Sequence, residues 1–409
     1  MTPPVKPQSP PRYVLTLLLA VNLLNYIDRQ ALYAVFPLIK ADLHLSDTAL
    51  GFLGSAFMLC YMLSAPLFGW LAGRAGRTTI AAVGVALWSL ATVCSGAAAG
   101  YRTLLGSRTI VGVGEASFGT VSPGLLADFF PKEERGRIIS CFYLAIPVGS
   151  ALGYLLGGII GQRYGWHAAF FLVGAPGLLL ALPVWFLREP APVAGKIRRR
   201  SSWSDYLSLA RNRSFVITTL AMAAMTFAMG GLAQWAPTFL HRMHGLEVGR
   251  ANIFFGGITV VAGIIGTVTG GLLGDRCQRS SRFGYLTVSG WGFILGAPVL
   301  AWAIFSPSLP GSLLAIFLAE SFLFFNTGPL NTVILNVTPQ PLRAMAFAVN
   351  IFFIHALGDA VSPTLLGWFS DLTDLRRSLL ITPPAVVVAA CFCFLGRRFV
   401  GADMDEVGE

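Results

Sequence analysis

The chain has 409 residues, of which 55% are hydrophobic and 12% are charged, about half the charged share of an ordinary soluble domain. So few charged residues cannot cover a water-facing surface, and we expect lipid to be the solvent for most of the chain. The formal net charge of +10 does not indicate nucleic acid, because the basic residues lie in short stretches between apolar runs and form no cluster with aromatic partners.

Twelve apolar segments follow one another along the chain, and each is long enough to cross a bilayer as a helix. We expect these spans at residues 13–39, 47–73, 78–99, 103–129, 137–162, 166–187, 214–240, 249–275, 284–305, 311–337, 343–369 and 377–398. A polar N-terminal tail, 1–12, precedes them and an acidic tail, 399–409, follows them. A basic linker, 188–213, separates an N-terminal bundle, 13–187, from a C-terminal bundle, 214–398.

The Lys and Arg residues are distributed unequally between alternate loops. An N-terminus in the cytoplasm places 20 of them on the cytoplasmic side and seven on the other side. Because basic loops remain in the cytoplasm, we expect a multi-pass protein of the cell (inner or plasma) membrane with both termini inside.

The two halves of the chain resemble one another. The sequence GWLAGRAGR follows the second span, and GLLGDRCQR follows the eighth, 202 residues later. Glycines also recur in the fifth and eleventh spans, where they predict close helix packing. Parallel repeats of six helices are the architecture of the major facilitator fold. The predicted fold class is therefore an all-α membrane protein with twelve transmembrane helices in two pseudo-symmetric six-helix bundles.

Three motifs resemble those of a known family. GWLAGRAGR, after the second span, resembles the GxLxxRxGR loop signature of the major facilitator superfamily, and RTIVGVGEA, residues 108–116, resembles its fourth-helix RxxxGxGE pattern. NYIDRQAL in the first span, together with GEAS in the fourth, is similar to the Spinster-like branch. This resemblance implies a secondary transporter of lysophospholipid-like or sphingolipid-like anions.

The loop signature departs from the superfamily pattern at one place. An Asp usually occupies its fifth position, but the first copy has Gly73, whereas the second copy keeps Asp275. If an ion pair closes the cytoplasmic side, we expect it to involve Asp275. The predicted cytoplasmic gate comprises Arg74, Arg77, Asp275 and Arg276.

Charged residues inside the spans are the strongest local indication of function. A charge at the centre of a membrane helix costs about 2.5–3.5 kcal/mol on an insertion scale, so such residues must pair, lose their charge or face water. In the N-terminal bundle, Arg108 and Glu115 are two helical turns apart on one face, whereas the adjacent Asp28 and Arg29 point about 100° apart. One arrangement pairs Arg29 with Glu115 and Asp28 with Arg108 across the first and fourth spans.

These four residues predict either a static salt-bridge network or a working site. We favour a working site, because a buried ion pair contributes little net stability. A carboxylate in a changing environment can take up and release a proton, and an Arg can hold an anionic headgroup through paired hydrogen bonds. The predicted residues are Asp28 and Glu115 for proton coupling, and Arg29, Arg108, Tyr26 and Asn25 for substrate binding.

The C-terminal bundle carries a different polar set. Glu320 and Asp359 lie within its spans, and His355 precedes Asp359 by four residues on the same helical face. These three residues form either a structural polar contact or a second titrating site. Aromatic residues dominate the rest of this interior and suit the acyl tail of an amphiphile.

The leading function is a proton-coupled secondary transporter that moves an amphiphilic anion by alternating access. The alternatives are a transporter of small organic anions or sugar acids and, in another class, a passive channel or membrane receptor. The sequence has no GxxxxGK[ST] loop for ATP, no nucleophile–base or metal constellation, and no cysteine spacing for zinc. We therefore expect no enzyme activity and no cofactor, a proton gradient as the energy source, and a monomer whose partners are lipid, protons and substrate.

Overall fold

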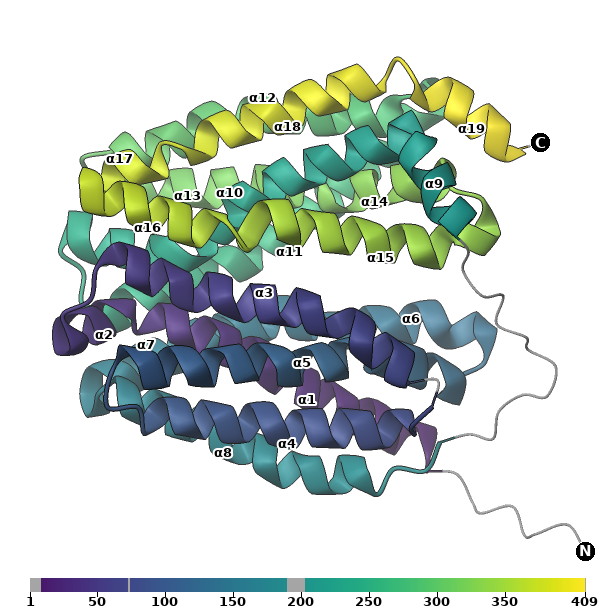
Figure 1. Cartoon of the computed structure of the whole chain (residues 1–409). Helices are drawn as coiled ribbons and strands as arrows, with labels where there is room; N and C mark the ends of the chain where they lie inside the picture. The colour runs from purple at the N-terminus through teal and green to yellow at the C-terminus, as the bar shows by residue number, and fades with distance from the viewer. Residues whose placement is uncertain (1–8, 73, 190–202, 409) are drawn as a thin grey trace, which may run out of the picture. The chain divides into compact units, whose positions relative to one another are not determined.

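A computed structural model describes residues 9–72, 74–189 and 203–408, and the regular structure in these ranges is helical throughout (Figure 1). Eleven helical segments in the described ranges are long and apolar enough to cross a membrane. The first helix, α1 (Pro11–Ala34), is not among the eleven. It carries Asp28, Arg29 and several amides, and these lower its hydropathy. With α1 as the twelfth span, the predicted fold class is confirmed.

The described chain forms two compact units, which we treat separately. Unit 1 contains residues up to Leu45, Ala56–Lys196 and the short segment Glu247–Gly256. Its helices are α1, α2 (Phe36–Leu43), most of α3 (Asp47–Leu71), α4 (Arg77–Gly96), α5 (Tyr101–Phe129), α6 (Lys132–Tyr143), α7 (Ala145–Tyr164) and α8 (Trp166–Trp185).

Small residues bring the helices of unit 1 into close contact. On α7, Gly149, Gly153 and Gly157 lie against α1, and a Cβ at Gly153 would be only 2.6 Å from the Ile27 carbonyl oxygen. A row of glycines at this spacing lets two backbones approach. The glycines of the fifth span therefore fix the position of α1, which carries the charged residues.

Unit 2 contains Ile197–Leu246, Gly257–Glu409 and the short segment Ser46–Ser55 from the start of α3. Its other helices are α9 (Trp203–Arg211), α10 (Arg213–His244), most of α11 (Val248–Ser280), α12 (Gly284–Phe305), α13 (Leu309–Phe324), α14 (Thr327–Asn336), α15 (Arg343–Ile354), α16 (Ser362–Leu372), α17 (Leu375–Leu379), α18 (Thr382–Gly396) and α19 (Val400–Gly408), with a π-helical segment at His355–Asp359. The core of unit 2 is apolar and includes Leu232 of α10, Phe293 of α12 and Val386 of α18.

Five predicted spans are interrupted, and the twelfth breaks at Leu380 and Ile381, between α17 and α18 and before Pro383. The first span breaks at Val35, before Pro37, and the fifth breaks at Leu144, before Pro147; each proline lacks the N–H that would continue the helix. The tenth span breaks between α13 and α14. The eleventh changes to π-helix near Gly358, whose backbone is not helical.

Two helices occupy segments that we expected to be a linker and a tail. In α9, Leu209 is buried, and in α19, Val400 is buried while Asp403 accepts a hydrogen bond from the Ser214 backbone N–H. Packing against unit 2 therefore orders both short helices, which the sequence pattern did not reveal. The linker residues 190–202, including Lys196, lie outside the described ranges.

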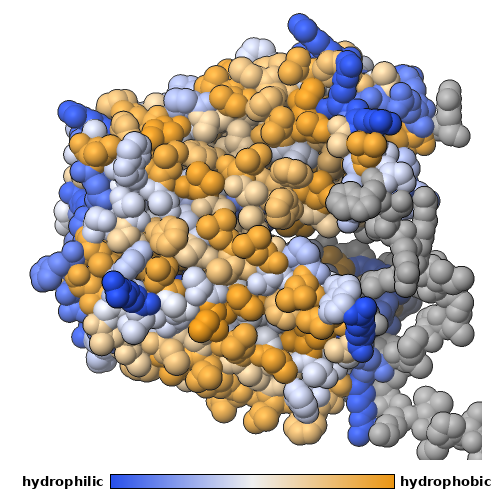
Figure 2. All heavy atoms as spheres, viewed as in Figure 1, coloured by the Kyte–Doolittle hydropathy of each residue, from blue (hydrophilic) through white to orange (hydrophobic). Residues whose placement is uncertain are grey.

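The outer faces of the helices are apolar. Leu63 and Leu179 are each 72% exposed, and Leu272 is 67% exposed. Figure 2 shows apolar residues over the length of the helices in this view and hydrophilic residues gathered towards their ends. Such a surface is stable in hydrocarbon and unfavourable in water.

Candidate functional site

Two ion pairs connect α1 and α5 inside unit 1. The Arg29 Nε donates to Glu115 Oε2 at 2.7 Å, and the Arg108 Nη1 donates to Asp28 Oδ1 at 2.9 Å. The pairing expected from the sequence is confirmed. Two turns separate Arg108 from Glu115, and this spacing gives each cation its own carboxylate.

Glycines between the two charges of α5 allow neighbouring helices to approach. A Cβ at Gly112 would collide with the Phe57 carbonyl oxygen of α3, and a Cβ at Gly114 would be 2.7 Å from the Trp88 backbone nitrogen of α4. The RxxxGxGE pattern thus has a physical basis. It places two charges on a helix whose intervening surface is smooth enough for close packing.

The Asp28–Arg108 pair is enclosed, and its carboxylate is fully satisfied, although Arg108 Nε is buried without a partner in the described ranges. Both side chains are at most 2% exposed. Besides Arg108, Asp28 accepts a hydrogen bond at 2.5 Å from Thr92 Oγ1 of α4, so each carboxylate oxygen has a donor. The carboxylate of this pair therefore has more donors than that of Glu115.

The Arg29–Glu115 pair is incompletely satisfied. The Glu115 side chain is fully buried, and its Oε1 has no hydrogen-bond partner among the described residues. The Arg29 side chain is 14% exposed, and within the described ranges its hydrogen bonding is confined to Nε. The two terminal nitrogens of Arg29 therefore remain available to another acceptor.

Three aromatic rings surround the Arg29 guanidinium. Its Cζ lies 5.1 Å from the ring centre of Tyr26, 5.1 Å from that of Phe57 and 5.0 Å from that of Tyr61. These distances are within the range of cation–π attraction. Sequence reasoning included Tyr26 but missed Phe57 and Tyr61. They are four residues apart on one face of α3, but many other aromatic residues in the spans have similar spacing.

Comparison with known proteins places this chain in a family. Residues 18–363 match the sequence model of the Major Facilitator Superfamily. Protein spinster homolog 1 of Xenopus laevis is 36% identical over 414 residues, which cover 95% of this chain and 78% of that protein. The chain belongs to the Spinster family of the Major Facilitator Superfamily. It is therefore a multi-pass membrane transporter and not an enzyme.

Two further Spinster proteins resemble this chain. The sphingosine-1-phosphate transporter SPNS2 of Mus musculus is 33% identical, over 93% of this chain and 76% of that protein. A crystal structure of a bacterial homologue of the human lysosomal transporter Spinster superposes with a TM-score of 0.88, over 97% of this chain and 99% of that chain, at 24% identity. The structural similarity shows a shared fold.

Asn25, which we included among the substrate-binding residues of this Spinster protein, is buried on α1.

In unit 2, Glu320 Oε1 accepts a hydrogen bond from Thr259 of α11 at 3.2 Å, and Glu320 Oε2 is buried without a partner in the described ranges. His355 Nδ1 lies 2.8 Å from Asp359 Oδ1 within the π-helical segment. The hydrogen bonds of the described residues do not join Glu320 to this pair, so the second polar site is divided into two parts.

The predicted gate residues of unit 1 have local partners. Arg74 stacks on Trp70 at 3.6 Å, and Arg77 donates to Asp128 at 2.7 Å and to Glu189 at 2.9 Å. Glu189 also accepts the Thr78 backbone N–H at the start of α4. Gly73, where the loop signature departs from the superfamily pattern, lies outside the described ranges.

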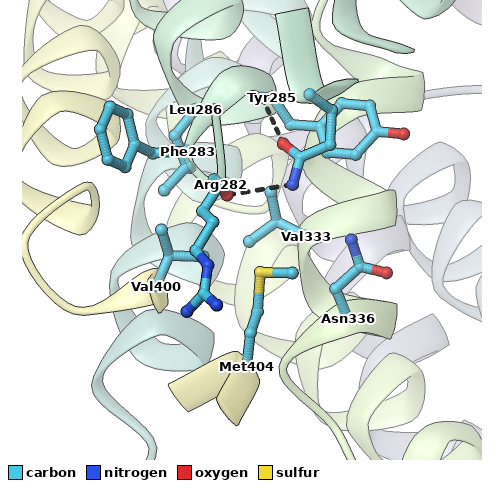
Figure 3. Close-up of a pocket in the computed structure, with 9 residues that line it drawn as sticks. Arg282, Phe283, Tyr285, Leu286, Val333, Asn336, Val400 and Met404 are labelled. Atoms are coloured by element: carbon cyan, nitrogen blue, oxygen red, sulfur yellow. Dashed lines mark hydrogen bonds between the residues drawn. The ribbon is translucent and has the colours of Figure 1, made fainter. Parts of the chain in front are cut away.

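The predicted gate residues of unit 2 lie near the end of α11. Asp275 Oδ1 accepts the Tyr285 hydroxyl at 2.7 Å and makes no ion pair with a described residue, while Arg276 is exposed. Figure 3 shows Tyr285 among the residues that line a pocket between α11, α12, α14 and α19. In this pocket, the Gln278 side chain donates a hydrogen bond to the Arg282 carbonyl oxygen and accepts one from the Tyr285 backbone N–H. The gate assignment stays a prediction.

A further polar cluster in unit 2 was not predicted. Arg242 of α10 binds both carboxylate oxygens of Asp47, at 2.6 and 2.8 Å, and Ser370 of α16 donates to Asp47 at 2.6 Å. Asp371 accepts the backbone N–H groups of Asp47 and Thr48, each at 2.8 Å. The first turn of α3 is therefore attached to α10 and α16. An Asp at the start of a helix is too common for the sequence to reveal this role.

Proposed function

We propose that this Spinster protein couples proton uptake to the transport of an amphiphilic anion by alternating access. The observation that supports the proposal is the difference between the two ion pairs. Asp28 has a donor for each carboxylate oxygen, whereas among the described residues Glu115 has a buried oxygen without a donor and the terminal nitrogens of its partner Arg29 have no acceptor. Of the two carboxylates considered for proton coupling, the contacts favour Glu115.

The chemistry of this pair links the proton to the anion. A buried carboxylate oxygen without a donor is costly while the group is charged, and a proton on Glu115 lowers that cost by removing the charge. Protonation also deprives the Arg29 guanidinium of its counter-ion. An anionic headgroup can then bind the terminal nitrogens of Arg29 through paired hydrogen bonds. Each event favours the other, as binding linkage requires.

The substrate class is proposed from charge and from the relatives. A guanidinium at membrane depth suits a phosphate or carboxylate head, and membrane surroundings suit a long apolar tail. Relatives in Mus musculus and Danio rerio are named as sphingosine-1-phosphate transporters. We therefore propose a lysophospholipid or a sphingolipid-like anion as the substrate and the proton gradient as the energy source, with no other cofactor. We also propose that the protein is a monomer.

The distribution of basic residues among the loops supports the membrane placement that we propose. We propose that both termini lie in the cytoplasm and that the protein resides in the cell membrane, because cytoplasmic termini leave the larger number of basic residues inside. Accessibility of single cysteines placed in the loops of a cysteine-free variant tests this orientation.

Transport into proteoliposomes with an imposed pH gradient tests the function. A labelled lysophospholipid and gluconate are compared in the unmodified protein, Glu115→Gln and Asp28→Asn. We expect the lysophospholipid to move with the gradient and Glu115→Gln to remove the response to pH. Movement of gluconate alone would assign the protein to the transport of small organic anions. A pH response that survives in Glu115→Gln but fails in Asp28→Asn would move the proton site to Asp28.

A further inference from the structure

One aromatic ring lies between the two ion pairs of unit 1. The Phe57 ring centre is 5.1 Å from the Arg29 Cζ and 5.6 Å from the Arg108 Cζ. Phe57 is 1% exposed, so both contacts occur away from water. A single ring thus faces the cation of the enclosed pair and the cation of the incompletely satisfied pair.

The backbone around Phe57 holds this ring in place. Its carbonyl oxygen packs against Gly112 of α5, midway between Arg108 and Glu115 in the sequence. The Tyr61 ring lies one turn further along α3, with its centre 6.3 Å from that of Phe57. The ring is therefore fixed to the helix surface that carries two of the four charges.

We propose that Phe57 is a positioning residue: it couples the two ion pairs and, with Tyr26 and Tyr61, holds the Arg29 guanidinium in place when Glu115 becomes neutral. The physical reason is the fate of Arg29 after protonation. A guanidinium that loses its carboxylate in a low-dielectric interior needs another source of negative potential. The faces of the three rings supply it. Arg29 then stays at a fixed position where a ligand anion replaces Glu115, and this last step rests on the proposed function.

Fluorinated phenylalanines at position 57 test the coupling without changing the size of the side chain appreciably. One, two and three ring fluorines progressively withdraw negative charge from the ring face, and thermal stability is measured in detergent without ligand. We expect the unfolding temperature to fall with each fluorine. Glu115→Gln should steepen this dependence, because the rings are then the main partners of Arg29, and Arg29→Met should make it shallower. The matched control is the same series at Phe118, a buried ring that packs against Trp88.

The proposal would be overturned if the unfolding temperature did not change with the number of fluorines at position 57, or if it changed equally at Phe118. A dependence that Arg29→Met leaves unchanged would overturn it as well. Phe57→Leu removes the ring face entirely, and Phe57→Tyr restores it as a second check. The cation–π range corresponds to a change of about twofold to thirtyfold in an equilibrium constant.

Ligand binding separates this proposal from the proposed function. Lysophosphatidic acid and a monoacylglycerol with the same chain serve as anionic and neutral probes. We expect fluorination at position 57 to weaken binding of lysophosphatidic acid and to leave the monoacylglycerol unchanged. Equal weakening of both probes would reduce Phe57 to a packing residue. If the unmodified protein binds neither probe while the stability series keeps its dependence, the coupling of the ion pairs stands and the substrate class is wrong.

Discussion

Removal of the two arginines should have different consequences, and this difference is the most direct test of the site. In Arg108→Met, the Asp28 carboxylate would keep Thr92 as its one donor in the described ranges while remaining buried. Breaking a buried ion pair from one side costs about 3–5 kcal/mol. We expect a loss of that size in the free energy of unfolding.

Arg29→Met should cost less. Its partner Glu115 can bind a proton and so escape the penalty of an unpaired buried charge. Cation–π contacts are lost in both variants, because Arg108 also lies 5.6 Å from the Phe57 ring centre and 5.9 Å from that of Phe170, so the difference comes from the carboxylate that is left behind. The Arg29 side chain is also partly exposed, at 14%. The functional order should be reversed, since Arg29→Met should abolish binding of an anionic lysolipid while the protein stays folded.

Unfolding in mixed micelles measures both variants under the same conditions. The matched control is the double variant Asp28→Asn with Arg108→Met, which removes both charges and should recover much of the stability lost in Arg108→Met. Equal losses for the two single variants would refute the distinction between an enclosed and an incompletely satisfied pair. The same conclusion would follow if the double variant recovered nothing.

Three further predictions concern the coupling carboxylate, the helix contacts and the attachment of α3. Glu115→Gln, which mimics the protonated side chain, should make lysolipid binding independent of pH. Binding titrations at pH 5 and pH 8 check this, and an unchanged pH response would exclude Glu115 as the proton site. Gly112→Ala should abolish transport, because the added Cβ collides with the α3 backbone. The control is Gly124→Ala on the same helix, whose added Cβ meets nothing within 4 Å and should leave transport intact. Equal transport by the two variants would contradict the importance of this helix contact. Asp371→Asn should speed hydrogen exchange at the first turn of α3 by weakening two backbone caps; mass spectrometry checks this, and unchanged exchange would show that Arg242 alone suffices.

The sequence by itself was enough to predict that lipid surrounds most of the chain, and to predict the fold class and the family. A low charged fraction and twelve apolar segments leave lipid as the only suitable solvent, and the paired loop motifs indicate two repeats. The sequence also offered, as one arrangement, the pairing of Arg29 with Glu115 and of Asp28 with Arg108 that the structure shows. Unpaired charges in a membrane are costly, and helical periodicity limits how four charges on two helices can meet.

Only the tertiary structure decided how the four charges differ. The positions of Thr92 and of the Phe57 and Tyr61 rings depend on how α3 and α4 pack against α1 and α5, and this contact rests on backbone approach at glycines. Periodicity places a residue on a face of its own helix but does not say which neighbouring side chain meets it. For the same reason, the sequence did not show that Asp47 and Arg242, 195 residues apart, meet in one cluster.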